Sequence, residues 1–253
     1  MRPGQASGCP AATWRSPRRT GKRYPGAFLV FNGHMRRSLS AVTLALGALL
    51  VAPVGSLATI SEVGQVGGTR SATPSCPTSP CLAVSRTSGF QVKVGATSRS
   101  MFTVPRSGKL GAWTITLGKP SAKQIKYFDS TEGGPASAAV SVLRSGRHLT
   151  YRLLAESPTQ LLQPYFGQTV QFPLDQSLPV SKGQIVALTV PTWAPALALG
   201  FANTTSWRAS RAKGKCSDTT TQAAHIQVSS VLTYTCLYRT ARLTYSATLI
   251  STP

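Results

Sequence analysis

Side chains that could perform hydrolytic chemistry are scarce in this chain. A serine hydrolase needs a nucleophile, a base that activates it and an acid that orients the base. Beyond residue 58 there are two histidines, His148 and His225, and no Gly-x-Ser-x-Gly sequence. His148 follows the turn-forming pair Gly146-Arg147, and His225 lies in a long polar segment. We therefore expect both histidines to be surface residues, and we predict no catalytic serine site.

Carboxylates are equally few. The region after Cys81 has five acidic residues, which are Asp129, Glu132, Glu156, Asp175 and Asp218. A glycosidase needs two facing carboxylates, and only Asp129 and Glu132 are close enough in sequence to share a loop. The same two side chains could instead join backbone carbonyls around Ca²⁺. The D-x-x-E spacing alone is weak evidence, so we interpret both as solvated loop residues and predict no catalytic residue, metal or cofactor.

Aromatic and cationic side chains in the last third of the chain have a pattern suited to binding. Trp193 lies between Pro191 and Pro195 just after an apolar run, a loop-like position for an exposed ring, although packing over one end of the sandwich is favoured. Trp207 precedes several cations and could stack on a ligand ring or on its own arginines. The predicted ligand-binding residues are Trp193, Trp207, Arg208, Arg211, Lys213 and Lys215.

Four cysteines remain beyond the N-terminal region that contains Cys9, and they are Cys76, Cys81, Cys216 and Cys236. An even number in an exported chain favours disulfides, and four cysteines allow three pairings. We favour Cys76–Cys81, because the two prolines of CPTSPC turn the chain, and Cys216–Cys236, which closes a loop of roughly 20 residues. A zinc site is the disfavoured alternative, since C-x4-C, C-x19-C and a solitary histidine match no standard ligand spacing.

A secretion signal precedes these residues, although it starts only at Met35. A short basic segment is followed by an apolar run over residues 39–54 and by the small-x-small sequence Ser56-Leu57-Ala58. Residues 35–58 are therefore predicted to be a helical signal peptide, and the protein to be secreted or held at the cell surface. Retention as a membrane anchor is the alternative, because about 20 residues span a bilayer. Residues 1–34 are predicted to be a basic disordered extension, unless translation starts at Met35.

The charge balance favours anionic partners. Beyond Ala58 the chain has 19 Lys and Arg residues and all 6 acidic ones, a formal charge of about +13. Outside a cell, such a charge attracts anionic wall polymers, lipid head groups or extracellular polysaccharide. The cations are dispersed and accompany no recognition helix or zinc-finger spacing, so we expect no specific nucleic-acid binding. A basic solvated surface without a partner is the plainer alternative.

The elements that must position these side chains are predicted to be strands. Large apolar residues alternate with threonines over residues 113–117, and residues 243–249 alternate in the same way. Period-two alternation marks strands with one buried face. Short strands separated by Gly- and Pro-containing turns are typical of an antiparallel sandwich or barrel. We predict an all-β antiparallel β-sandwich over residues 81–253, after a flexible linker rich in Gly, Ser, Thr and Pro over residues 59–80.

Two stretches fit this pattern poorly. Residues 118–137 are predicted to form a long loop, within which Ser121–Phe128 could make two helical turns with Ser121 as the N-cap. Residues 206–230 carry several cations and then a Thr-rich segment. We expect an irregular excursion there, tied at its ends by the Cys216–Cys236 bridge, and long loops of this kind are often functional.

A wider pattern runs through residues 101–192. The sequence F-T-V-P-x-x-G-x-L-x-x-W begins at Phe102, V-L-R follows at Val142, and L-P-V-x-x-G-x-I-V-A-L begins at Leu178. This pattern resembles a group of secreted, mostly uncharacterised β-sandwich proteins of high-GC Gram-positive soil bacteria, and residues 234–245 resemble it less distinctively. The resemblance implies a jelly-roll-like sandwich. It implies no catalytic residue, and a shared sandwich would not determine function.

These observations predict an exported, disulfide-stabilised sandwich that binds anionic or polysaccharide material of the cell envelope without catalysis. An extracellular hydrolase acting on polymer is the second hypothesis, and the missing catalytic constellation counts against it. A structural component of a surface layer is the third.

Overall fold

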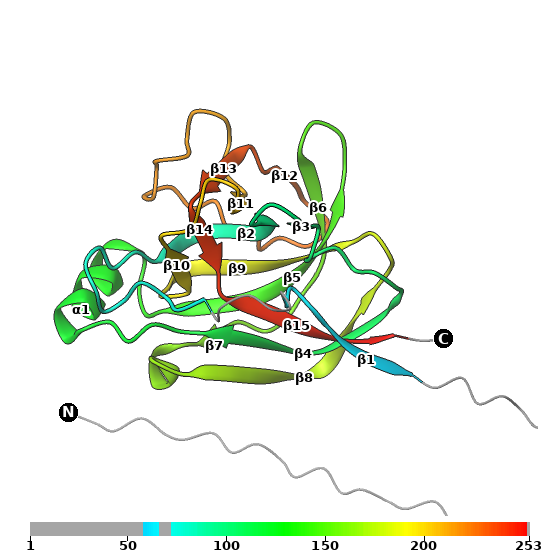
Figure 1. Cartoon of the computed structure of the whole chain (residues 1–253), viewed down its shortest axis with the longest axis horizontal. Helices are drawn as coiled ribbons and strands as arrows, with labels where there is room; N and C mark the ends of the chain where they lie inside the picture. Colours follow the sequence, from blue (N-terminus) through cyan, green and yellow to red (C-terminus); the bar gives the residue numbers. More distant parts are fainter. Residues whose placement is uncertain (1–57, 66–71, 252–253) are drawn as a thin grey trace, which may run out of the picture. The chain divides into compact units, whose positions relative to one another are not determined.

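The computed structural model describes residues 58–65 and 72–251 (Figure 1). Within these ranges the chain is predominantly antiparallel β, with one α-helix and one short 3₁₀ helix, so the predicted all-β class is confirmed. The predicted extension, residues 1–34, and the predicted signal peptide, residues 35–58, lie outside the described residues except for Ala58. No helix within the described ranges combines the length and apolar character needed to cross a bilayer.

A four-stranded antiparallel sheet has the strand order β1-β15-β4-β8. Its strands are β1 (Thr59–Val63), β4 (Gly108–Thr116), β8 (Thr169–Val180) and β15 (Tyr245–Ser251). The predicted linker over residues 59–80 therefore begins with a strand, in which Thr59 lies opposite Ser251 and Val63 is buried. The physical reason is that β15 presents backbone donors and acceptors on this side, which an extended segment from the other end of the chain satisfies.

A larger, nine-stranded sheet has the central order β12-β6-β5-β9-β2-β11-β13. These strands are β2 (Val84–Val94), β5 (Ser137–Ser145), β6 (Thr150–Glu156), β9 (Ile185–Ala194), β11 (Ser206–Ala209), β12 (Val231–Thr233) and β13 (Cys236–Arg239). Two short strands join it, since β3 (Ser98–Arg99) pairs with β2 and β7 (Gln160–Leu161) pairs with β5. A separate two-stranded sheet consists of β10 (Leu197–Leu199) and β14 (Ala241–Leu243).

Both large sheets contribute side chains to one hydrophobic core. Trp113 of β4 is fully buried, as the alternation predicts, and its ring lies 4.8 Å from that of Phe172 on β8. Tyr245 of β15 connects the two sheets. Its ring stacks on Phe102 at 4.3 Å, and its hydroxyl donates to the backbone oxygen of Val186 on β9 at 3.0 Å. A buried hydroxyl without such an acceptor would cost about 1–3 kcal/mol, so this bond helps to set how the sheets meet.

The segment between β4 and β5 contains the helix α1 (Ala122–Thr131), at one end of the sheets in Figure 1. Ser121 is its N-cap, as predicted, and forms a capping box. The Ser121 hydroxyl accepts from the Gln124 backbone N–H at 3.3 Å, and the Gln124 side chain accepts from the Ser121 N–H at 2.8 Å. The helix continues beyond the predicted two turns to Thr131, and the ring of Phe128 packs on Trp193 of β9 at 4.7 Å between ring centroids. The 3₁₀ helix η1 (Gln163–Tyr165) precedes β8.

Candidate functional site

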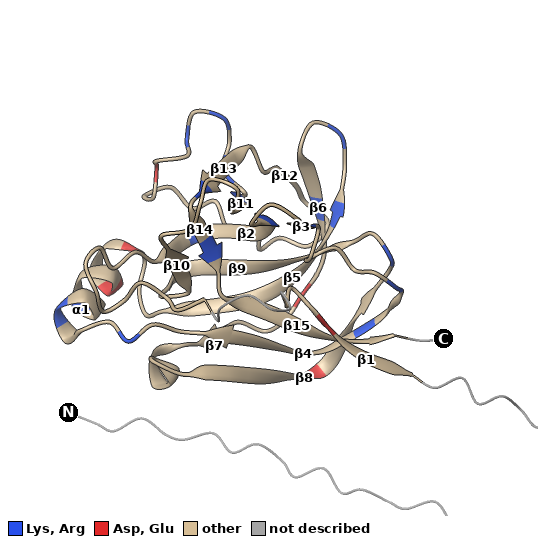
Figure 2. Cartoon of the chain, in the orientation of Figure 1, with Lys and Arg blue, Asp and Glu red and all other residues tan. Residues whose placement is uncertain are grey.

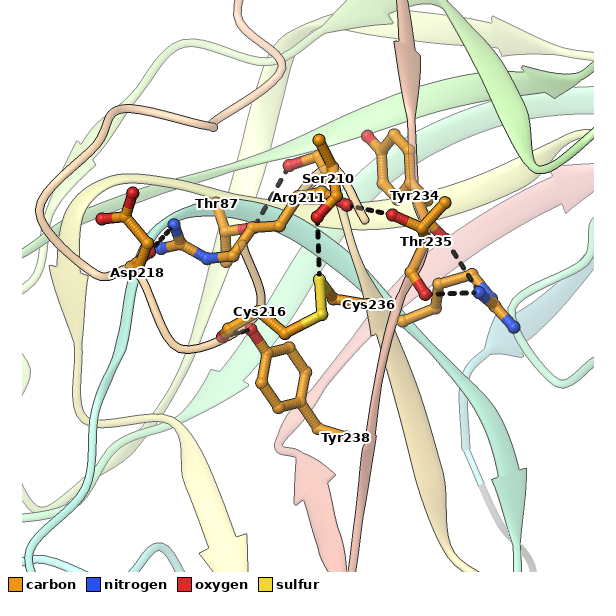
Figure 3. Close-up of a disulfide and its surroundings, with 11 residues drawn as sticks. Thr87, Ser210, Arg211, Cys216, Asp218, Tyr234, Thr235, Cys236 and Tyr238 are labelled. Atoms are coloured by element: carbon orange, nitrogen blue, oxygen red, sulfur yellow. Dashed lines mark hydrogen bonds between the residues drawn. A yellow bond between two sulfur atoms is a disulfide. The ribbon is translucent and has the colours of Figure 1, made fainter. Parts of the chain in front are cut away.

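The excursion between β11 and β12, residues 210–230, folds back along the larger sheet. The Ser210 N–H donates to the backbone oxygen of Ser88 at 2.9 Å, and Ala223 forms a bridge with Thr87. The disulfide Cys216–Cys236 ties the excursion to β13 (Figure 3), and Cys76–Cys81 is the second disulfide. Both predicted pairings are confirmed. A cavity of about 450 Å³ is formed by the excursion, with Arg211, Lys215, Asp218, His225 and Ser230 among its lining residues.

Arg211 fastens this excursion to the sheet. Its side chain is buried, and its guanidinium donates to the backbone oxygens of Ser85 at 2.9 Å and Thr221 at 3.4 Å, and to that of Asp218 (Figure 3). A buried charge is tolerated when hydrogen bonds replace its hydration, as these carbonyls do here. The burial of Arg211 does not suit the ligand contact that its position in the sequence suggested.

The side chains of Trp207 and Arg208 also make stabilising contacts within the fold. Trp207 was predicted to contact a ligand, but it is 5 % exposed and stacks on Tyr238 of the neighbouring strand at 4.5 Å between ring centroids. Arg208 is half-buried and donates to the backbone oxygens of Tyr234 at 2.9 Å and Thr235 at 3.3 Å. Residues 206–209 form the strand β11 between β2 and β13, so Trp207 is packed from both sides. The sequence could not reveal this placement, because both neighbouring strands are distant along the chain.

Trp193 is likewise part of the core and not an exposed ring. It is fully buried, because β9 continues through it to Ala194, opposite the start of β2. Its indole N–H donates to a carboxylate oxygen of Asp129 at 2.9 Å and to the backbone oxygen of Gly134 at 3.1 Å. The other oxygen of Asp129 accepts from the Gln163 side chain at 2.9 Å. Asp129 therefore holds buried side chains in place and is not the free loop carboxylate that we expected.

Lys213 and Lys215 are the predicted contact residues that the structure leaves exposed. Both lie on the short segment between Arg211 and the disulfide, and Lys215 also lines the cavity. No acidic side chain in the described ranges lies within ion-pair distance of either lysine. Their ammonium groups are therefore free to attract an anion, and the neighbouring disulfide limits the movement of the segment that carries them.

Asp218 is the acidic residue that lines the same cavity. Its carboxylate accepts from the backbone N–H groups of Thr220 and Thr221, each at 3.1 Å, and from both of their hydroxyls at 2.9 Å. These hydrogen bonds, those to Thr221 above all, hold the pKa of Asp218 well below its usual range. Asp218 therefore shapes the excursion as an ionised turn residue, with its oxygens occupied by the chain itself.

His225 is 1 % exposed, so the prediction of a surface histidine was wrong. Its Nε2 lies 2.9 Å from the Ser230 hydroxyl, and its Nδ1 lies 3.1 Å from the Tyr234 hydroxyl. The Ser230 hydroxyl donates to the backbone oxygen of Gln227 at 2.6 Å, which leaves its oxygen to accept from Nε2–H. Burial lowers the pKa of His225, which favours the neutral ring. In this arrangement His225 is a satisfied core residue, because it donates to Ser230 and does not accept its proton.

A chain of buried hydroxyls leads from the His225 backbone across the larger sheet. The His225 N–H donates to Ser88 at 2.8 Å, Ser88 lies 2.8 Å from Thr189, and Thr189 lies 2.6 Å from Ser141. Ser141 donates to the Glu156 carboxyl at 3.4 Å. Burial raises the pKa of Glu156 to about 7, although the Ser141 bond opposes this shift. Serine and threonine side chains of this kind would face water on an exposed sheet. Here they are buried and hydrogen-bonded into one internal polar network.

Glu156 is expected to make the stability of the protein depend on pH. An ordinary glutamate has a pKa of about 4.3, so the folded protein binds this proton more tightly than the unfolded chain does. The resulting stabilisation is complete below about pH 4.3 and is lost as the pH rises through about 7. The shift corresponds to at most about 4 kcal/mol, and partial exposure to solvent reduces the expected value to about 1–2 kcal/mol.

Urea unfolding of the native protein and of Glu156→Gln across this pH range measures the effect. The amide keeps the hydrogen bond from Ser141 but does not titrate, so the difference in unfolding free energy between the two proteins should change through the window in favour of the variant. Parallel pH profiles for the two proteins would contradict the assignment to Glu156.

Sequence reasoning did not find the network formed by Ser88, Ser141, Thr189 and Glu156. Its one signal was a single polar residue inside an otherwise apolar strand, such as Ser141 in residues 138–143. That signal shows that a hydroxyl is buried but does not show which hydroxyl on another strand it meets. A comparison of the chain with protein-family models, with curated proteins and with solved structures found no match.

Proposed function

We propose that this protein is exported and acts outside the cytoplasm as a non-catalytic binding module for anionic envelope polymer, with the two large sheets forming a jelly-roll-like sandwich. Two disulfides favour an oxidising compartment, which agrees with the signal sequence over residues 35–58. The core that both sheets share supports the sandwich. A structural surface component or a polymer hydrolase has no comparable support in the geometry of the described residues.

The observation that carries this proposal is the excess of cations without acidic partners. In residues 58–65 and 72–251, a single pair of opposite charges lies within 4 Å, and it joins Arg86 to Glu132 at 3.9 Å. Figure 2 shows Lys and Arg on several loops, on α1 and on strands of the fold, with few acidic residues among them. Cations that the protein does not neutralise must be balanced by solution anions. A polyanion that replaces those small ions gains affinity from their release, as nucleic-acid binding illustrates.

The loop of Lys213 and Lys215 is the proposed centre of this binding. Both lysines are exposed, and Lys215 lines the cavity formed by the excursion, which gives a polymer both charge and a recess. Arg211 and Arg208 contribute indirectly, since their hydrogen bonds to backbone oxygens hold the excursion and β11 in place.

Changing Lys213 and Lys215 together to glutamine tests the proposal. A lysine close to an anionic surface contributes about 1 kcal/mol, so the double variant should bind purified anionic wall polymer about 30-fold more weakly at low salt. Co-sedimentation across a salt series measures the affinity and its salt dependence. Binding should weaken with added salt for the native protein and less steeply for the variant.

The matched control changes Arg106 and Lys182 to glutamine, which removes the same charge from exposed turns elsewhere. We expect this control to lose much less affinity than the loop variant. Equal losses of polymer affinity in both variants would show that binding depends on the charge of the whole surface and not on the lysines of the loop. Binding that salt does not weaken, or no retention on any anionic polymer, would contradict the proposed function.

A further inference from the structure

A second cavity, of about 440 Å³, lies where the start of β2, the helix α1 and the tip of the excursion meet. It shares no lining residue with the cavity near His225. Among the residues that line it are Leu82, Lys123, Tyr127, Glu132 and Thr219. Its volume is in the range that small-ligand sites occupy, about 300–1,000 Å³. Four of its features point to a ligand.

The first feature is an irregular backbone at Arg86. The register between β2 and β9 shifts between Ser85 and Thr87, and Arg86 has a φ of 42°, in the left-handed region. Bulges of this kind redirect a side chain, and left-handed non-glycine residues are enriched at ligand sites. The redirected guanidinium donates to the backbone oxygens of Thr131 at 3.2 Å and Thr220 at 2.5 Å. Arg86 thereby joins the end of α1 to the tip of the excursion, beside Glu132 of the cavity lining.

The second feature is the carboxylate of Glu132, which lines this cavity. Glu132 is 9 % exposed, and its Oε2 is buried with no hydrogen-bond partner among the described residues. The Nε of Arg86 is 3.9 Å from this oxygen, close enough for charge attraction but too far for a hydrogen bond. An unpaired buried acceptor lowers stability by about 1–3 kcal/mol. No donor in the described residues pairs with this oxygen, so a ligand could supply one.

The third feature is the exposed ring of Tyr127. This side chain is 60 % exposed, and its ring meets Phe128 edge-to-face at 5.5 Å. Leu82, on the same cavity, is 46 % exposed. The contact with Phe128 restricts the tyrosine ring, so a ligand that packs on its face loses little side-chain entropy. Tyr127 was not among the aromatic residues that the sequence suggested for binding.

The fourth feature is the mixture of charges, which selects the class of ligand. Glu132 repels an anion, while Lys123 of the cavity lining and Arg86, which lies beside Glu132, repel a cation. A neutral molecule with hydroxyl donors avoids both penalties, because a hydroxyl can donate to a carboxylate without bringing charge into the cavity. An apolar face of C–H groups is needed as well, to cover Tyr127 and Leu82. A pyranose ring carries both the hydroxyls and the apolar face.

We propose that this cavity binds one neutral sugar unit of a polysaccharide, with its apolar face on the Tyr127 ring and a hydroxyl donating to Glu132. This inference goes beyond the proposed function, because the site is separate from the Lys213–Lys215 loop and its ligand carries no charge. It assigns the protein two contacts with envelope material, one with anionic polymer and one with neutral glycan.

The test is titration calorimetry of the full chain with neutral hexasaccharides of glucan, xylan, mannan and chitin type, at low and high salt. At least one should bind, with an affinity that salt leaves unchanged. Tyr127→Ala should weaken that binding about tenfold, while Tyr127→Phe, which keeps the ring, should bind like the native protein. Glu132→Gln, which keeps one acceptor oxygen but removes the charge, should also weaken binding several-fold.

Leu161→Ala is the matched control, since Leu161 is 63 % exposed on β7 and does not line the cavity. It should bind as the native protein does. Thermal unfolding of Tyr127→Ala should be close to native, because its ring is mostly in solvent. The proposal is overturned if no hexasaccharide binds, or if Tyr127→Ala and Leu161→Ala bind alike. Because the charge test uses anionic polymer and Lys213 and Lys215, either proposal can fail without the other.

Discussion

Replacing Trp193 by alanine is expected to lower the free energy of unfolding by about 3–5 kcal/mol, as for other buried tryptophans. The indole is fully buried and packs on Phe128 of α1, so its removal leaves a cavity between the helix and β9. The same change leaves Asp129 and the backbone oxygen of Gly134 without the donor that they share. An ordinary domain is stable by about 5–15 kcal/mol, so the loss is a large share of the total.

Equilibrium urea unfolding measures this effect. Trp193→Phe is the informative companion variant, because it retains most of the packing and removes the N–H donor. Its cost should be smaller, about 1–3 kcal/mol, the penalty for leaving a buried acceptor unpaired. If Trp193→Ala left stability unchanged and instead abolished binding to envelope polymer, the ring would be a contact residue as its sequence position suggested. The burial of Trp193 would then have no energetic consequence.

Loss of the Cys216–Cys236 disulfide is the second large effect, and the double variant Cys216→Ala/Cys236→Ala should be less stable by about 3 kcal/mol. The bridge spans a sequence separation of 20, and closing such a loop removes conformational freedom from the unfolded chain. Alanine suits the buried Cys236 site, because serine would place an unpaired hydroxyl there. Freed from β13, the segment with Lys213 and Lys215 should also bind anionic polymer more weakly.

The other disulfide provides the control for this prediction. Cys76–Cys81 spans a sequence separation of 5, so the chain-entropy relation predicts a smaller loss for its double alanine variant, about 2 kcal/mol. Its removal should leave polymer binding by the lysine loop unchanged. Denaturant midpoints and slopes for both variants, together with polymer affinity, distinguish the two cases. A larger loss for the shorter loop would mean that native-state contacts, and not loop closure, dominate the stabilisation.

Local patterns in the sequence predicted the features that depend on near neighbours. Alternation over residues 113–117 placed Trp113 in the core, and Ser121 was found as the N-cap of α1. The cysteine spacing led to both disulfides, because short loops bring their ends together at low entropic cost. Each of these features is set by residues within about one element or one loop of the chain.

The burial of individual side chains, by contrast, depends on strands that lie far apart in the sequence and pair in the fold. Trp193 and Trp207 have neighbours that suggested exposed loops, yet pairing with β2 and β13 buried both rings. Contacts with distant segments also buried His225, and burial raised the pKa of Glu156. A side chain's exposure is a property of what packs on it, and in an antiparallel fold those contacts come mostly from distant segments.

The sequence by itself determined that this protein is all-β, strongly basic and held by two disulfides, because composition and short-range spacing suffice for those properties. Only the tertiary structure decided which polar groups are free. Arg211, Asp129 and Asp218 are hydrogen-bonded to the protein's own backbone and side chains. The ammonium groups of Lys213 and Lys215 have no acidic partner in the described ranges. Whether a group is free depends on where its partners lie in space, which short-range sequence patterns do not encode.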